Sequence, residues 1–218
     1  LEKAGLVLQR QMEKGHYDRF RGRIIFPIFK DTGKVVAFGG RTIFDADPKY
    51  LNSPDTSIYT KGHHLYGLNH TKNSIRQTGE VILVEGYTDF LIPFQEGVTN
   101  IVASLGTSLT PHQVMLAKRF APRMTISFDG DAPGRKAALR AISLGFENGI
   151  QTKVVPLPSG YDPDNFIKKY GVEKFKALKE KGIPGLKFLI DSQLQENKMD
   201  VPEEKAKVLR NIVREIEK

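Results

Sequence analysis

Residues 81–89, Val-Ile-Leu-Val-Glu-Gly-Tyr-Thr-Asp, decide the fold that the sequence predicts. Four consecutive apolar residues, mostly β-branched and free of proline, are typical of a strand buried on both faces of a parallel sheet. Glu85 then lies at the carboxyl end of that strand, where open α/β sheets bind ligands. Gly86 permits a tight turn into a helix that should begin near Tyr87. Asp89, four residues after Glu85, is expected to point to the same place.

Strands and helices alternate on either side of this stretch. We predict strands at 81–84, 99–103, 124–128 and 152–156, and helices at 87–96, 111–119 and 133–148. Such alternation specifies a parallel sheet with right-handed crossovers. From residue 162 onward the pattern is helical, with breaks at Gly171, 182–184 and 201–202.

The first third of the chain predicts smaller elements. Residues 1–14 predict a helix that stops at Gly15, and Ile24–Phe29 with Val35–Phe38 predict a β-hairpin. Residues 45–63 are rich in turn formers and predict a long irregular loop, which usually has a function. A helix is expected at 65–75, ending near Gly79.

We therefore expect an α/β protein (α+β overall) in three parts. Residues 1–78 should form a basic N-terminal subdomain of mixed α/β structure, residues 79–160 a parallel-sheet subdomain that binds metal, and residues 161–218 a helical subdomain. The 218-residue length is enough to bury a substantial core.

The net charge of +8 is unevenly distributed. Residues 1–78 carry 13 Lys and Arg against 7 Asp and Glu, residues 79–160 carry 7 against 7, and residues 161–218 carry 13 against 11. A basic first third beside a group of acids indicates a polyanion held near a bound metal. The alternative is that the basic residues serve solubility alone.

Composition excludes several kinds of chemistry. The chain has no cysteine, so disulfides, thiolate catalysis and Cys-ligated zinc are excluded within it. No apolar stretch is long enough to span a bilayer, and no signal peptide is recognisable, which fits a cytoplasmic protein that does not act at a membrane. The chain begins at Leu1 within an amphipathic pattern, and we interpret it as part of a longer protein.

Six acids follow the predicted parallel strands. They all lie at the carboxyl ends of these strands or in the turns just after them: Glu85, Asp89, Asp129, Asp131, Asp162 and Asp164. Mg²⁺ prefers such hard oxygen ligands, together with substrate phosphates and water. Carboxylates gathered without cations would raise one another's pKa, so a divalent ion or basic neighbours should compensate. The structural alternatives are a helix N-cap for Asp162 and a first-turn helix position for Asp89.

Basic residues of the first third are candidate phosphate contacts. Arg21 and Arg23 are predicted to share one face of an extended strand, which suits phosphate tracking, although a solvated edge is the alternative. Arg41 follows two glycines and offers a bidentate fork, with a β-bulge as the structural alternative. His63 and His64 could touch phosphate, but single histidines are mostly structural or solvated.

Four segments share a recognisable pattern: Val84-Glu85-Gly86-Tyr87-Thr88-Asp89, residues 103–108, Phe128-Asp129-Gly130-Asp131 with Gly134-Arg135, and Asp162-Pro163-Asp164. Together they resemble the Toprim fold of bacterial replicative primases. Residues 19–27, 38–41, 49–54, 61–62 and 65–68 resemble the basic subdomain that precedes Toprim in these primases. The resemblance covers most of residues 17–170. A Glu with Asp-x-Asp alone would also fit topoisomerases, recombination-mediator proteins and small nucleases.

The resemblance implies a set of site residues. Glu85, Asp129 and Asp131 would be the catalytic metal centre, with Asp89, Asp162 and Asp164 as further metal ligands. Nucleic acid or nucleotide would be contacted by Arg41, Lys49 and Lys61, and by Asn52 from the same matching segments. Arg21 and Arg23 of the predicted strand are candidates for the same contacts. The expected cofactor is Mg²⁺ or Mn²⁺, with two or more ions.

The resemblance also implies a reaction and partners. A primer 3′-hydroxyl would attack the α-phosphate of a ribonucleoside triphosphate on a single-stranded DNA template, giving an RNA–DNA hybrid. A zinc module and a domain that binds the replicative helicase would lie outside these residues, so no zinc is expected here. The protein would work in the bacterial cytoplasm, at a nucleoid-associated replisome. Rival functions are a Toprim nuclease or topoisomerase, or a non-catalytic nucleic-acid-binding module with a structural ion.

Two departures from the family pattern are small. Asp55 stands where Glu is common, and Thr88 stands where Met is common.

A topoisomerase would need a nucleophilic tyrosine on another domain, and nothing marks any of the seven tyrosines as one.

Overall fold

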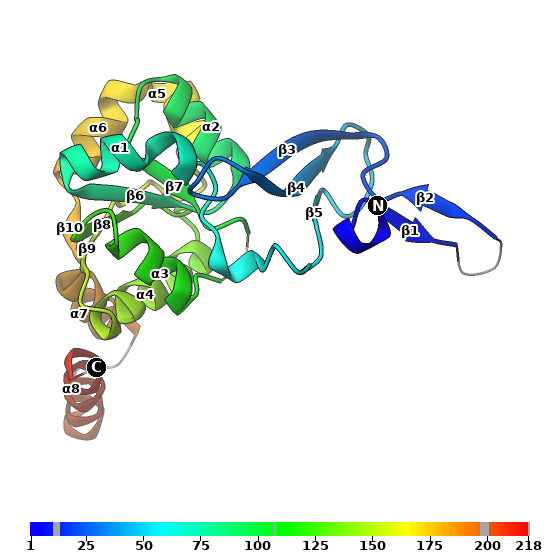
Figure 1. The fold of residues 1–218 in the computed structure, drawn as a ribbon. Helices are drawn as coiled ribbons and strands as arrows, with labels where there is room; N and C mark the ends of the chain where they lie inside the picture. The colour runs from blue at the N-terminus through cyan, green and yellow to red at the C-terminus, as the bar shows by residue number, and fades with distance from the viewer. Residues whose placement is uncertain (11–13, 107, 197–200, 218) are drawn as a thin grey trace.

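The computed structural model describes residues 1–10, 14–106, 108–196 and 201–217. A short hairpin, a three-stranded sheet and a larger α/β body follow one another along the chain (Figure 1). The hairpin pairs β1 (Val7–Gln9) with β2 (His16–Asp18), and the antiparallel sheet has the order β3 (Arg23–Phe29), β4 (Val35–Thr42), β5 (Tyr50–Asn52). Two 3₁₀ helices, η1 (Glu2–Ala4) and η2 (Lys61–His63), complete this N-terminal part.

The body is built on a five-stranded sheet of order β10-β9-β8-β6-β7. All neighbouring strands are parallel except the antiparallel edge strand β10. The strands are β6 (Glu80–Val84), β7 (Ile101–Ala103), β8 (Arg123–Ile126), β9 (Gln151–Val154) and β10 (Ile183–Pro184). The helices are α1 (Leu68–Thr78), α2 (Tyr87–Gln95), α3 (Pro111–Lys118), α4 (Ala132–Glu147), α5 (Pro163–Tyr170), α6 (Val172–Glu180), α7 (Gly185–Glu196) and α8 (Pro202–Ile216).

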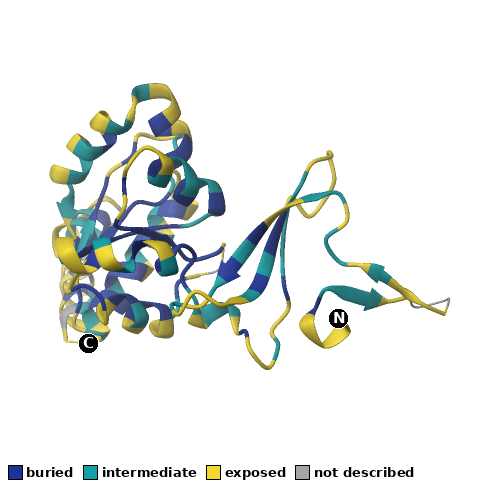
Figure 2. Ribbon diagram, turned by 45° about the horizontal axis from the view of Figure 1, so that its top comes forward, coloured by how far each residue is buried: buried dark blue, intermediate teal, exposed yellow. Residues whose placement is uncertain are grey.

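Helices cover both faces of this sheet, because alternate residues of each strand point to opposite sides. Val81 and Leu83 of β6 belong to a hydrophobic cluster with α3, α4 and α7. Ile82 and Val84 belong to a second cluster with α2, α5 and α6. The strands form the buried centre of the body in Figure 2. The expected α/β fold with a central parallel sheet is confirmed.

Local capping chemistry explains why the predicted helices begin where they do. Thr110 caps α3 by accepting the backbone N–H of Gln113 at 3.2 Å, and Pro111 occupies the first turn. Asp162 caps α5 in the same way, accepting the N–H of Asn165 at 2.6 Å. These interactions are encoded within four residues, so the sequence pattern predicts them well.

Three predictions in the N-terminal part were wrong. The helix expected over 1–14 is replaced by η1 and the hairpin, because Gly5 adopts a left-handed backbone (φ 66°) that ends the helical turn; residues 11–13 of that prediction lie outside the described residues. The loop expected at 45–63 contains β5 and η2. Arg21 lies in a turn beside Gly22 (φ 60°), so it does not share a strand face with Arg23.

The three-stranded sheet joins the body through aromatic packing. Phe26 of β3 stacks on Tyr87 of α2 with ring centroids 4.6 Å apart, and Tyr66 meets the same tyrosine edge-on at 4.8 Å. A Cβ at Gly39 would lie 2.0 Å from the Tyr87 hydroxyl. Only glycine at position 39 therefore lets β4 pack this closely against α2.

The segment after residue 160 contributes to the same body. Phe166, Ile167 and Phe175 are buried in the cluster that contains the β6 residues Ile82 and Val84. The strand β10, which the helical pattern did not predict, pairs antiparallel with β9. Among the described residues, no helix is long and apolar enough to cross a membrane.

Candidate metal centre and nucleic-acid interface

The sheet topology brings the carboxyl ends of β6, β8 and β9 side by side. The chain passes from β6 to β7 on one side and returns to β8 on the other, so β6 marks a topological switch point. Ligands of open α/β sheets bind at this position. Glu85 follows β6 directly, the Asp129-Gly130-Asp131 turn follows β8, and Asp162 and Asp164 follow β9.

Backbone N–H groups hold several of these acids. Asp89 Oδ2 accepts the N–H of Gly86 at 2.9 Å, and Asp131 Oδ1 accepts the N–H of Gly134 at 2.8 Å as the N-cap of α4. Both carboxylates are therefore oriented by the start of a helix, where the macrodipole favours negative charge.

The acids act on one another electrostatically. Burial raises the pKa of Glu85 to about 7, and the charges of Asp129 and Asp131 add to this shift. Burial also raises the pKa of Asp89 to about 7, with further contributions from Asp162 and Asp129. The pKa of Asp129 is raised by burial and by Asp162 and Asp131. Asp129 thus lies within electrostatic reach of the acids that follow β6 and β9.

Asp164 differs from the other five acids because it has a cation of its own. Its Oδ1 lies 2.7 Å from Lys168 Nζ one turn along α5, and its side chain is 10% exposed. The charge of Asp164 reaches Asp89, where it is the smallest of the contributions that raise the pKa.

Two glycines let the backbone of the acidic turn pack closely. A Cβ at Gly130 would lie 2.2 Å from the carbonyl oxygen of Pro158, and one at Gly134 would lie 2.2 Å from the carbonyl oxygen of Asp129. The turn after β8 is therefore fixed against the segment after β9. A cavity of about 330 Å³ adjoins it, lined by Asp129, Asp131 and Arg135 among others.

The donor set fits a hard divalent cation. Glu85 Oε1 is buried and has no hydrogen-bond partner, although a buried carboxylate oxygen normally has one. A cation would satisfy this oxygen and relieve the repulsion that adds to the effect of burial on the three pKa values. Among the described residues, no three Asp, Glu or His side chains lie close enough together to hold a metal ion as they stand.

The predicted phosphate contacts lie in the turn before β3, on the three-stranded sheet and its loops, and on η2. Arg41 of β4 lies over the Tyr50 ring at 5.6 Å, and Arg21 lies over the Tyr17 ring at 4.6 Å. Arg23 donates to the carbonyl oxygens of Gly40 and Lys49, at 3.3 and 3.4 Å.

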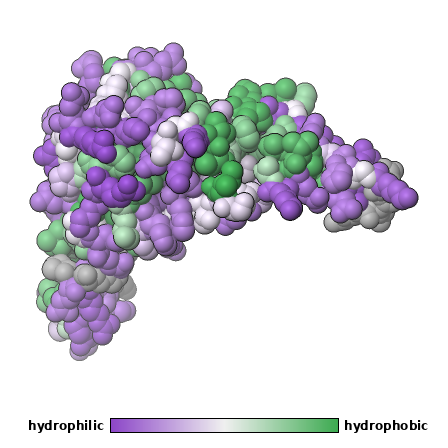
Figure 3. All heavy atoms as spheres, in the orientation of Figure 1, coloured by the Kyte–Doolittle hydropathy of each residue, from purple (hydrophilic) through white to green (hydrophobic). Residues whose placement is uncertain are grey.

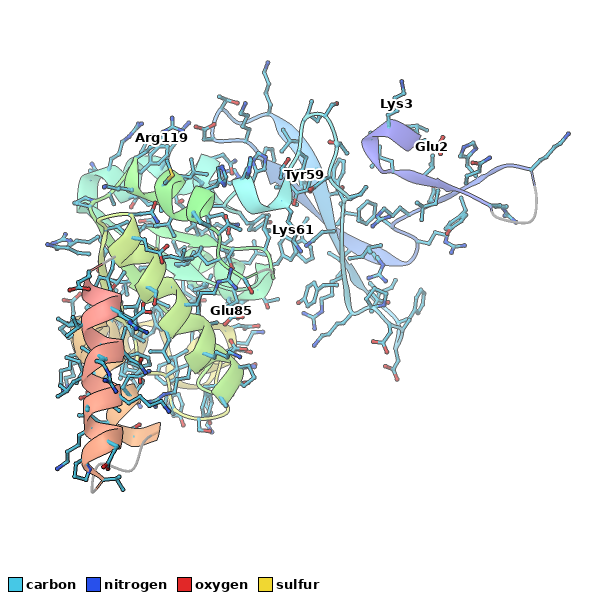
Figure 4. The ribbon with its side chains drawn as sticks, turned by 90° about the horizontal axis from the view of Figure 1, so that it is seen from below. Glu2, Lys3, Tyr59, Lys61, Glu85 and Arg119 are labelled. Carbon is cyan, nitrogen blue, oxygen red and sulfur yellow. The ribbon has the colours of Figure 1, made fainter. Side chains whose placement is uncertain are left out.

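Lys49 and Lys61 differ in their surroundings. The side chain of Lys49 is exposed, whereas Lys61 is half-buried on η2 and burial lowers its pKa despite the nearby Asp55. Figure 4 shows Lys61 and Glu85 on the side of the body that faces the three-stranded sheet.

Asn52 has partners within the protein at both ends of its amide. Tyr87 Oη donates to Asn52 Oδ1 at 2.6 Å, and Asn52 Nδ2 donates to the Leu105 carbonyl at 3.3 Å. Leu105 itself has a left-handed backbone (φ 70°), which is uncommon for a residue with a branched side chain. Asn52 therefore bridges the sheet and the body at the edge of the site.

Sequence reasoning did not assign a role to Tyr87, Tyr50 or Arg19. Tyr87 orients Asn52, Tyr50 supports Arg41, and Arg19 donates to the Asn52 carbonyl at 3.2 Å. Only the position of Tyr87 in the first turn after Glu85 could have marked it; the other two depend on pairing between distant segments.

A parallel sheet with Glu at the end of one strand and Asp-x-Asp after its neighbour defines a Toprim-type domain. Comparison with known proteins agrees: residues 82–167 match a family described as "Toprim-like", and residues 1–72 match "DNA primase catalytic core, N-terminal domain".

Individual relatives point to one family. The chain is 44% identical to a DNA primase of Clostridium acetobutylicum, covering all of this chain and 36% of the relative. A DNA primase domain from Pseudomonas aeruginosa is 35% identical, with a TM-score of 0.92, over 99% of this chain and 68% of the solved one. A DnaG primase catalytic domain solved with single-stranded DNA is 35% identical, with a TM-score of 0.89, over 99% and 71%.

The chain belongs to the DnaG-type family of bacterial DNA primases. It spans about a third of the length of the curated relatives that it matches. Toprim and primase core families depend on a divalent metal ion.

Proposed function

We propose that this chain carries the nucleotidyl-transfer centre of a DNA primase, which makes short RNA primers on single-stranded DNA. The observation that carries the proposal is the juxtaposition of Glu85, Asp129 and Asp131 at the switch point of a Toprim-type sheet, with a basic sheet facing them. The named activity of the relatives supports it.

Each group of residues has a part in this reaction. Glu85, Asp129 and Asp131 would hold Mg²⁺ or Mn²⁺, and Asp89, Asp162 and Asp164 would extend the site toward a second ion. Such ions, when bound, activate the attacking hydroxyl and stabilise charge on the α-phosphate. Asp89 also fixes Gly86, and thereby the turn that positions Glu85.

The basic residues would bind phosphates. Arg41, Lys49 and Lys61, with Arg21 and Arg23, would hold the template strand or the ribonucleoside triphosphate, since phosphate contacts position nucleic acid without reading its sequence. The Arg41 guanidinium lies over the ring of Tyr50, 5.6 Å from its centroid, in a cation–π arrangement. Asn52 would act by keeping the sheet in register with the body as well as by touching nucleic acid.

The setting of the proposal follows from the family. We place the protein in the bacterial cytoplasm, in a replisome, with a replicative helicase as a partner through residues outside this chain. The product would be an RNA–DNA hybrid. We retain the division into a basic part (1–78), a Toprim part (79–160) and a helical part (161–218) as a proposal.

The test is to incubate the chain with single-stranded DNA, ribonucleoside triphosphates and Mn²⁺ and to analyse the nucleic acids. Short RNA that requires the template and is lost in Glu85→Gln supports a primase. Cleaved or relaxed DNA would instead indicate a nuclease or topoisomerase. Binding without any product would indicate a non-catalytic module.

A further inference from the structure

A second groove lies beside the turn between β3 and β4, and the site described above does not use it. Its volume is about 590 Å³, and it lies between that turn and the loop leading to η2. The side chains that matter here are Lys30, Lys34, Val35, Ile58, His63 and His64.

The groove is positively charged. Lys30 and Lys34 are both exposed, and neither ammonium group has a carboxylate partner among the residues that the structure describes. Burial lowers the pKa of His64, and the charges of His63 and Lys30 lower it further, while Asp31 acts against them. No Asp or Glu lines the groove itself among the described residues. This arrangement attracts an anion.

Rings and aliphatic side chains lie beside these cations. His63 stacks on His112 of α3 at 4.0 Å, and His64 stacks on the buried Tyr59 at 5.2 Å. Ile58 is 64% exposed and Val35 is 45% exposed. Flat rings and apolar contacts next to cations are what single-stranded nucleic acid needs, since its bases stack while its phosphates pair with Lys.

The walls of the groove are held firmly. Lys72 of α1 donates to the Asp31 carbonyl at 2.6 Å, which anchors the β3–β4 turn. Thr110 donates to the Gly62 carbonyl at 2.5 Å, and Gln113 donates to the His64 carbonyl at 2.8 Å, so η2 is fixed on α3. A preformed groove loses little conformational entropy when it binds.

The groove also lies next to the proposed active surface along the chain. Lys61, a proposed phosphate contact, and His63, which lines the groove, belong to the same 3₁₀ helix, η2. Tyr59 and Lys61 lie close together in Figure 4. In Figure 3, hydrophobic residues gather over the three-stranded sheet and the segment that joins it to the body, between more hydrophilic surfaces.

We propose that this groove binds a further stretch of the single-stranded DNA template, beyond the nucleotides at the acidic edge. The proposal rests on the proposed function for the course of the strand. Lys30 and Lys34 contact phosphates, and the His63 and His64 side of the groove contacts bases.

The first test measures the salt dependence of binding to a short and a long single-stranded oligonucleotide. Lys30→Gln with Lys34→Gln should reduce the slope of log affinity against log salt by about 1.4 for the long one, since each lost contact removes about 0.7. The short one, which does not reach the groove, should keep its slope. Lys181→Gln with Lys205→Gln removes the same charge elsewhere and should change neither slope. Equal slopes for the long oligonucleotide in the two double variants would overturn the proposal.

The second test uses the absence of cysteine from the 218 residues. Ile58→Cys and Leu209→Cys introduce single thiols at sites of similar exposure, 64% and 62%, for a photoactivatable label. The label at 58 should crosslink to the long oligonucleotide, and the label at 209 should not. If the label at 58 crosslinks to free ribonucleotide but not to the oligonucleotide, the groove binds a nucleotide and not the DNA strand, which would overturn the proposal.

These outcomes are separable from the proposed function. Glu85→Gln removes RNA synthesis if the metal centre is assigned correctly, but it leaves the groove and its salt slope intact. Suppose that the wild-type chain makes no RNA, but the groove variants still show a reduced slope of log affinity against log salt. The proposed reaction is then wrong, and the assignment of the groove to single-stranded DNA is kept. If the wild type makes RNA while the groove variants keep the wild-type slope, the reaction stands and the groove does not bind the template.

Discussion

Glu85 shows how position turns an ordinary carboxylate into a candidate metal ligand. It follows a fully buried strand, one of its oxygens has no partner, and its pKa is raised to about 7. The run of apolar residues before it made this position predictable from sequence. The unpartnered oxygen was not predictable, because it depends on how the turns after β8 and β9 pack.

Divalent metal should stabilise the protein through these acids. At a Mg²⁺ concentration about 100-fold above its Kd, binding adds about 2.7 kcal/mol, or roughly 5–10 °C in Tm for a chain of this size. Asp129→Asn should lose most of this rise, measured by thermal unfolding with and without Mg²⁺. Asp191→Asn, which alters an exposed acid paired with Lys187, should keep it. A full rise in Asp129→Asn would contradict the assignment.

Without metal, the same acids should make stability fall as pH rises. The pKa values of Glu85 and Asp89 are raised to about 7 from 4.5 and 3.8, so the folded state binds more protons than the unfolded state between about pH 4 and 7. The stability that these two acids contribute is therefore fully present below this window and is lost across it as pH rises.

Asp89→Asn tests this directly, because the amide oxygen can still accept the Gly86 N–H. In metal-free buffer at pH 8 the variant should be more stable than the wild type by about 1–3 kcal/mol, since each pKa unit corresponds to about 1.4. Urea unfolding at pH 4 and pH 8 measures the difference. A variant that is equally stable or less stable at pH 8 would show that the raised pKa has another origin.

Among the elements, those with local signals were predicted and those that depend on distant partners were not. The strands β6 to β9 follow from apolar runs, and the helices between them follow from local signals such as the caps Thr110 of α3 and Asp131 of α4. The short strands β1, β5 and β10 have no pattern of their own, since each is defined by pairing with a neighbour. The missed strands do not change the expected positions of the acids, because the acids follow strands that the sequence predicts at their observed places.

Helix α6 contacts β6 through a long-range ion pair that the sequence pattern does not reveal. Glu80 of β6 is 9% exposed. Its carboxylate accepts hydrogen bonds from Thr125 at 2.6 Å and from Lys179 at 2.9 Å. The Nζ atom of Lys153 lies 3.7 Å from Glu80 Oε1. Burial alone would raise the pKa of Glu80, but these partners outweigh it and lower the pKa. The network links residues 99 positions apart.

Lys179→Met should therefore destabilise the protein by about 2–4 kcal/mol, because it leaves a buried carboxylate without its nearest cation. Lys176→Met on the same helix breaks only the exposed pair with Glu173 and should cost less than about 1 kcal/mol. Urea unfolding at pH 7 compares the two. Similar losses in both variants would mean that the Glu80 network adds nothing specific.

The whole molecule places a basic three-stranded sheet against an acidic edge. The division of the chain into parts by charge stays a prediction, and the contact between Phe26 and Tyr87 joins the three-stranded sheet to the body. Sequence could not show that Asn52 bridges them, because its partners Tyr87 and Leu105 lie 35 and 53 residues away.

Phosphate contacts by the basic part should appear in the salt dependence of binding to single-stranded DNA. Arg41→Ala, Lys49→Ala and Lys61→Ala should each reduce the slope of log affinity against log salt by about 0.7. Their Mg²⁺-induced rise in Tm should be unchanged. Lys187→Ala, which removes an exposed lysine of α7, is the control. If all three variants keep the wild-type slope, these residues do not contact the template phosphates.

We propose that Glu85, Asp129 and Asp131 form the metal centre of a nucleotidyl transferase. Extension of a short RNA annealed to a DNA template by one labelled ribonucleotide in Mn²⁺ measures this reaction by itself, because it isolates the transfer step from initiation. The wild-type chain should add the nucleotide, while folded Glu85→Gln, which still binds the primer–template, should add none. No extension by the wild type, or equal extension by Glu85→Gln, would show that these acids do not form such a centre.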